Sequence, residues 1–107
     1  MAEGSPSAAA LDAINQVRRR AGGNDQLVYP DLPAGMSQAN FDAAVISERE
    51  WEFGFENKRW FDLVRKDMVV SANKALYPYV DEHNQLLPKP QVEVDLFKGK
   101  LKQNAGY

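Results

Sequence analysis

The chain has 107 residues, enough for one small domain, and its 44% hydrophobic and 26% charged residues are ordinary for a globular protein. A net charge of -2 and a pI near 5.3 argue against nucleic acid as a partner, because phosphate binding needs a basic face. The absence of cysteine excludes disulfides, thiolate metal sites and a cysteine nucleophile.

The N-terminal region predicts a lead-in followed by a helix. Residues 1–6 have the composition of a flexible lead-in or of residues added to the native protein, so we expect the folded domain at residues 7–107. Between residues 7 and 21, apolar side chains recur at spacings of four, three and four and share one helical face: Ala10, Ile14, Val17 and Ala21. Gly22 follows at the position of a C-cap.

A second helix is predicted from Ser37, a suitable N-cap, to Glu56. At about 100° per residue, Glu48 and Glu52 fall within an apolar arc of this helix, which consists of Phe41, Ala44, Val45, Trp51 and Phe55. Aromatic side chains at helical spacing among aliphatic ones are usually core residues. We therefore expect four of them to be buried: Trp51, Phe53, Phe55 and Trp60.

Asn57 is predicted to break the helical run, because asparagine tolerates a left-handed backbone better than other non-glycine residues. A short helix should follow at residues 58–66, and a further helical turn is possible at residues 72–76. These segments make the predicted fold class mainly α.

The C-terminal tail has a different pattern. Pro88 and Pro90 favour extended backbone around them. Val92, Val94 and Leu96 then alternate with acidic residues, which is the period of a strand or strand-like segment. We therefore expect an extended, proline-containing tail that lies against the helices.

Glu48 and Glu52 are the strongest catalytic candidates, since two carboxylates one helical turn apart could perform acid–base work on a glycosidic bond. A carboxylate that faces an apolar core must be paired, however, or its desolvation is costly. Arginines are close in the sequence, so we favour a structural ion network over catalysis. Its predicted members are Arg18, Arg20, Glu48, Arg49, Glu52, Glu56, Arg59, Asp62 and Arg65.

The other candidate sites carry weaker signals. His83 is the only histidine, and a lone histidine in a polar loop is usually solvated, so no metal site is predicted. The sequence contains no glycine-rich phosphate loop and no Gly-x-Ser-x-Gly elbow, so we expect neither a cofactor nor enzyme activity. Tyr77 and Tyr79 flank Pro78 and are weak candidates for ligand contact, although packing against the helices is the favoured role.

Four stretches together resemble the C-terminal part of the SusD/RagB family: ALDAINQVRRRAG, FDAAVISEREWEFGFENKRWFDLVR, LLPKPQVEVDL and LKQNAGY. The residues that match the family's motifs are Asn15, Val17, Arg18, Arg20, Ala21, Gly22, Glu48, Arg49, Glu52, Phe53, Glu56, Arg59, Asp62, Leu63, Arg65, Pro88, Pro90, Gln103, Asn104, Gly106 and Tyr107. Three departures stand out: Asn57 replaces the usual glycine, Lys89 a common apolar residue, and Ala105 the proline of the closing motif.

The resemblance implies a fold and a function. Members of the family are surface lipoproteins of the outer membrane in Bacteroidetes-type bacteria, built on tetratricopeptide-like helix pairs. They capture oligosaccharides and pass them to a TonB-dependent, SusC-type transporter. They are several times longer than this chain and carry most of their aromatic sugar platform upstream of the matching region. The resemblance therefore implies that this sequence is an excerpt with a scaffold role, and that its lipid anchor and glycan site lie outside it.

Two other classes of function stay open at this point. A helical protein–protein adaptor without glycan binding is one, because tetratricopeptide-like pairs often bind peptides. A carboxylate glycosidase that uses Glu48 and Glu52 is the other, and it is less favoured.

Overall fold

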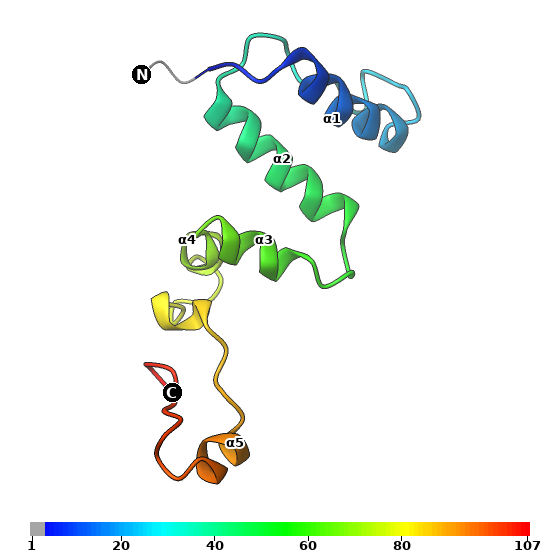
Figure 1. The fold of residues 1–107 in the computed structure, drawn as a ribbon. Coiled ribbons are helices and arrows are strands. Elements are labelled where there is room, and N and C mark those ends of the chain that lie inside the picture. Colours follow the sequence, from blue (N-terminus) through cyan, green and yellow to red (C-terminus); the bar gives the residue numbers. More distant parts are fainter. Residues whose placement is uncertain (1–3) are drawn as a thin grey trace. The chain divides into compact units, whose positions relative to one another are not determined.

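The computed structural model describes residues 4–107, which form helices and no strand (Figure 1). In chain order the elements are α1 (Ala8–Ala21), α2 (Gln38–Glu52), α3 (Arg59–Arg65), α4 (Val69–Asn73), the 3-10 helix η1 (Glu82–Gln85) and α5 (Gln91–Leu96). They belong to two compact units that divide between Arg59 and Trp60. The mainly α prediction is confirmed. Of the predicted lead-in at residues 1–6, residues 1–3 lie outside the described part.

Local sequence signals explain both ends of α1. The Ser7 hydroxyl accepts a hydrogen bond from the Ala10 amide at 3.2 Å and caps the first turn. At the other end Gly22 is the C-cap, and Gly23 adopts the left-handed conformation with φ 62°. The predicted helix and its glycine stop are confirmed.

Helix α2 begins as predicted but ends early. Ser37 caps it through a hydrogen bond from the Asn40 amide at 3.2 Å. The helix stops at Glu52 rather than at Glu56, because the following turn contains a left-handed residue at Phe55 (φ 67°). Asn57 is also left-handed, with φ 58°, so the prediction of a break at this asparagine is confirmed.

The first unit has a small core between α1 and α2. Ile14 of α1 and Phe41 and Ile46 of α2 are its buried apolar side chains. The expectation that Trp51 and Phe55 belong to a core is wrong in this structure. Trp51 is 78% exposed, because within the described residues no element covers its face of α2, and Phe55 is fully exposed on the turn that ends the helix. Phe53 and Trp60 are half-buried.

The second unit is held by short elements. Helix α4 contacts η1, and the unit's buried apolar side chains are Leu63 and Val69. The short helix predicted at residues 58–66 is confirmed as α3. The turn predicted at residues 72–76 overlaps only the end of α4, which begins at Val69.

The prediction of a strand-like segment at Val92, Val94 and Leu96 is wrong, because these residues lie in α5. Pro90 precedes the helix with φ -54°, a value already suited to a helical start, and the run is too short for alternation to identify a strand. Hence only the residues around Pro88 and Pro90 match the extended tail that we expected.

Side-chain amides of the closing residues fasten the end of the chain to this proline segment. The Gln103 amide accepts a hydrogen bond from the Lys89 backbone amide at 2.7 Å and donates one to the Lys89 carbonyl at 2.8 Å. Asn104 donates to the Leu87 carbonyl at 2.7 Å. Beyond them, the Tyr107 ring meets the His83 ring edge-to-face, with centroids 5.0 Å apart. His83 is half-buried, so the prediction of a solvated histidine is wrong in this structure.

We expect Gly106→Ala to destabilise the second unit. Gly106 has φ 94°, and an added Cβ would lie 2.6 Å from the Cβ of His83, so the substitution combines a strained backbone with a steric clash. The melting temperature should fall by several degrees, as for a loss of about 1–3 kcal/mol. Gly4→Ala is the control, since nothing lies within 4 Å of its Cβ position. Equal melting temperatures for the two variants would contradict the packing described for the tail.

Candidate functional site

The most connected polar site of the first unit is centred on Arg18, near the end of α1. Its Nε donates a hydrogen bond to the Pro30 carbonyl at 2.9 Å, and its Nη1 lies 2.8 Å from Oε2 of Glu48 on α2. The guanidinium carbon also stands 4.0 Å from the centre of the Tyr29 ring, a cation–π arrangement. One side chain therefore joins α1, the loop at residues 22–37 and α2.

Glu48 receives a second donor from the same loop. The Tyr29 hydroxyl donates to Oε2 of Glu48 at 2.8 Å, so one carboxylate oxygen accepts from both Arg18 and Tyr29. The Glu48 side chain is only 8% exposed. Burial, reinforced by the hydrogen bond to Glu48, raises the pKa of Tyr29, which keeps this phenol protonated as a donor. The Glu48 carboxylate thus has two hydrogen-bond donors in place.

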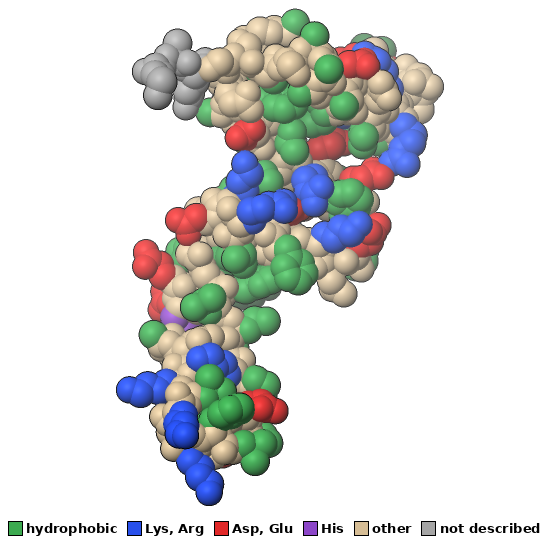
Figure 2. Space-filling view, in the orientation of Figure 1, with side chains coloured by type: hydrophobic (Ala, Val, Ile, Leu, Met, Phe, Trp, Pro, Cys, Tyr) green, Lys and Arg blue, Asp and Glu red, His purple; other side chains and the backbone are tan. Residues whose placement is uncertain are grey.

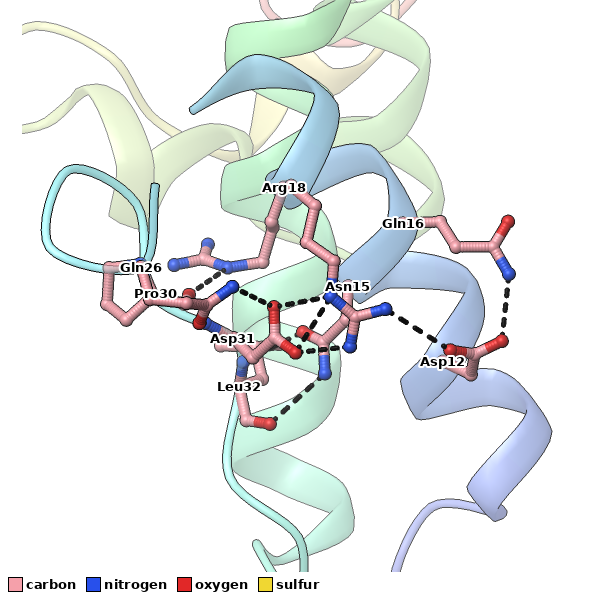
Figure 3. Close-up of polar contacts among 9 residues, drawn as sticks. Asp12, Asn15, Gln16, Arg18, Gln26, Pro30, Asp31 and Leu32 are labelled. Carbon is pink, nitrogen blue, oxygen red and sulfur yellow. Dashed lines mark hydrogen bonds and ion pairs between the residues drawn. The ribbon is translucent and has the colours of Figure 1, made fainter. Parts of the chain in front are cut away.

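A second cluster of polar contacts fixes the loop to α1 (Figure 3). The buried Asn15 side-chain amide accepts a hydrogen bond from the Leu32 backbone amide at 2.8 Å and donates one to the Leu32 carbonyl at 3.2 Å. It therefore pairs with both backbone polar groups of Leu32. Arg19 pairs with Asp31, with its Nε 3.0 Å from Oδ1. Gln26 donates to Asp31 and accepts from its backbone amide. These contacts hold the loop at residues 22–37 to α1.

The predicted charged residues outside this site form separate pairs. Arg20 pairs with Glu52, Arg59 bonds the Ile46 carbonyl and Glu50, Lys58 pairs with Glu56, and Arg65 pairs with Asp62; Arg49 lies over the Phe53 ring. Among the ion pairs named here for residues 4–107, Arg18–Glu48 has both side chains well buried, 13% and 8% exposed. The structure therefore gives each of these predicted members a local contact, and whether the contacts form one network stays a prediction.

Sequence reasoning missed the loop residues that complete the site. Tyr29, Asp31 and Gln26 lie in a proline-containing connection with no periodicity, so no pattern pointed to their partners. For Asn15, the match to a family motif was the one signal in the sequence. Its burial, which the structure shows, fits a role in binding backbone groups.

The weaker candidates are surface residues of the second unit. Tyr79 is 93% exposed and Tyr77 is 61% exposed, so both rings are open to solvent in this structure. Among residues 4–107 no group of His, Asp and Glu has a geometry that could hold a metal ion. None of the described helices combines the length and apolar character needed to cross a membrane.

Two apolar depressions flank the helix pair of the first unit. One, of about 330 Å³, lies along α1 and α2 and is lined mainly by small and aliphatic side chains such as Ala13, Val17 and Val45. The other, of about 480 Å³, is lined by Ala21, Gly22, Val28, Tyr29, Glu48, Trp51 and Glu52, and we call it the Trp51 groove. The carboxylates at both depressions already have arginine partners.

Glu48→Gln should destabilise the first unit by about 3 kcal/mol, because it leaves the Arg18 cation without its buried counter-ion. The free energy of unfolding is measured in urea at neutral pH for the parent chain and for Glu48→Gln. Glu50→Gln is the matched control on the same helix, since the pair of Glu50 with Arg59 is largely exposed and should contribute less than about 1 kcal/mol. Equal losses for the two variants would contradict a special role for Glu48.

The pH dependence of stability should include a contribution from Asp31. The hydrogen bond from Arg19 lowers the pKa of Asp31, so its stabilising effect is present above the ordinary pKa of about 4 and disappears as the pH falls through the folded-state value. The melting-temperature difference between the parent chain and Asp31→Asn should therefore be larger at pH 7 than at about pH 3. A difference that does not change with pH would contradict this assignment.

Comparisons with known proteins agree with this architecture. The family model described as "SusD family" matches residues 1–107. The chain is 29% identical to the SusD-like protein P2 of Formosa agariphila, over 94% of this chain and 21% of that protein. It also superimposes on the crystal structure of a SusD homolog from Bacteroides thetaiotaomicron with a TM-score of 0.76 and 33% identity, over 96% of this chain and 23% of the other. The chain thus spans about a fifth of these relatives' length, and it belongs to the SusD family.

Proposed function

We propose that this chain is the C-terminal scaffold portion of a longer, SusD-type surface protein that captures glycans. The observation that carries the proposal is the family match over residues 1–107 of a chain that spans only about a fifth of its relatives. The glycan is passed to a TonB-dependent, SusC-type transporter of the outer membrane. The protein is held at the cell surface by a lipid anchor outside this sequence.

The ion pairs of Glu48 and Glu52 support the scaffold role. Glu48 accepts hydrogen bonds from Arg18 and Tyr29, and Glu52 pairs with Arg20. A glycosidase would need one carboxyl group to donate a proton and another to act as nucleophile or base. In this structure the two glutamates instead neutralise arginines, so we propose a binding protein without catalytic activity.

The main glycan site is proposed to lie upstream of this region. Within the chain, Tyr77 and Tyr79 are the proposed auxiliary contacts, because exposed tyrosine rings offer an apolar face to a sugar and a hydroxyl at the edge.

The deciding experiment is calorimetric titration of a glycan panel into the family-length protein and into this chain. We expect micromolar to millimolar binding by the longer protein and much weaker binding by the chain alone, because the scaffold lacks the principal site. Equal affinities would place the site within residues 1–107 and contradict the proposal.

Variants then separate scaffold from ligand contact. Glu52→Ala should lower the melting temperature of the longer protein and leave its glycan affinity nearly unchanged, because Glu52 pairs with Arg20. Tyr79→Ala, the matched surface variant, should leave the melting temperature unchanged and weaken glycan binding by at most a few-fold.

Three other outcomes would contradict the proposal. A selective loss of glycan affinity in Glu52→Ala would favour a ligand role for Glu52, and release of reducing sugar would favour the glycosidase. Capture of the transporter without any glycan binding would favour the adaptor.

A further inference from the structure

The Trp51 groove combines large exposed apolar side chains with a shallow cavity. Trp51 is 78% exposed and Val28 is 69% exposed, and both line the depression of about 480 Å³. Figure 2 shows hydrophobic side chains at the surface of the first unit, beside Lys, Arg, Asp and Glu side chains. An exposed apolar cluster of this kind marks an interaction surface more often than a solvated one.

The chain as a whole has more apolar surface than its cores can bury. Among the described residues, five apolar side chains are buried: Ile14, Phe41, Ile46, Leu63 and Val69. Fourteen large hydrophobic side chains in the same part of the chain are exposed. This ratio is typical of an element whose apolar faces are covered by another part of a larger fold, because isolated domains expose large aromatic residues less often.

The charges at the groove indicate the chemistry of its occupant. Glu48 is bonded to Arg18 and Tyr29, and Glu52 is paired with Arg20. Both carboxylates are therefore paired with arginines within the chain, and the exposed side chains beside them in the groove, Trp51 and Val28, are apolar. Apolar side chains bury such a surface without needing polar partners, whereas each hydroxyl group of a sugar needs one.

We propose that the Trp51 groove is an intramolecular docking site, filled by apolar side chains from the polypeptide that family-length proteins carry outside the region matching this chain. The relatives supply that occupant: this chain spans 21% of one and 23% of the other, while nearly all of its own length is matched. This inference rests on the proposed scaffold role, and it names the Trp51 groove as the surface through which the scaffold contacts the rest of the protein.

Trp51 itself provides the probe. In a Trp60→Phe background Trp51 is the only tryptophan, since the chain contains two. Acrylamide quenching of its fluorescence is measured in the 107-residue chain and in the family-length protein. We expect efficient quenching in the chain and a several-fold smaller quenching constant, with a blue-shifted emission maximum, in the longer protein. Equal quenching in both would overturn the proposal.

Other occupants of the groove give different results. Protection that appears in the 107-residue chain as its concentration rises would identify a second copy and overturn the proposal. Protection that appears in the longer protein only after glycan addition would identify a ligand site and also overturn it. Protection in the longer protein without any glycan binding would support the docking site and contradict the proposed function, so the two failures are distinguishable.

A charge placed in the groove provides a second measurement. Trp51→Glu should lower the melting temperature of the longer protein and change that of the 107-residue chain little, because the side chain is exposed only in the latter. Ser47→Glu is the matched control, since Ser47 is polar, exposed and on the same helix. Equal losses for the two variants in the longer protein, or an equal loss for Trp51→Glu in both proteins, would overturn the assignment.

Discussion

The buried ion pair between Arg18 and Glu48 is the constraint on which the first unit depends. Burial of a lone carboxylate would cost several kcal/mol, and this cost is offset because Arg18 and Tyr29 both donate to the same oxygen. The same arginine holds the loop through the Pro30 carbonyl. Two helices and their connection are thus fixed by a few directional contacts rather than by a large apolar core.

This arrangement gives the charge-rich run at residues 47–67 a structural meaning. Glu48 and Glu52 pair with arginines of α1, and Asp62 pairs with Arg65 of the same run. We propose that the spacing of these carboxylates serves folding. Its aromatic residues are divided between half-buried positions, such as Phe53, and exposed ones, such as Trp51. We propose that exposed aromatic residues such as Trp51 are covered by other parts of a longer protein, and that the glycan binds upstream of this region.

Sequence patterns predicted the elements that depend on local interactions. The N-cap of α2 at Ser37, the glycine stop at Gly22 and the left-handed Asn57 follow from side-chain and backbone chemistry within a few residues. Long-range features were harder to predict. Trp51 has the spacing of a core residue, but burial depends on which element covers that face, and none of the described elements does.

The remaining errors have similar physical causes. The alternation at Val92, Val94 and Leu96 was too short to distinguish a strand from a turn of helix, and a proline at the start favoured the helix. The contacts of Tyr29 and Asp31 join residues of an irregular loop to helices at 12 to 19 positions' separation, so no periodicity could predict them. Family motifs identified many of the residues that matter here without revealing their partners.

A double-mutant cycle of Arg18→Met and Glu48→Gln tests the central claim most directly. Urea unfolding of the parent, both single variants and the double variant gives the coupling free energy between the two side chains. If the buried pair organises the first unit, the coupling is about 1–3 kcal/mol and the double variant is little less stable than either single variant. A coupling near zero would contradict the account, because it would mean that α1 and α2 are held together without this pair.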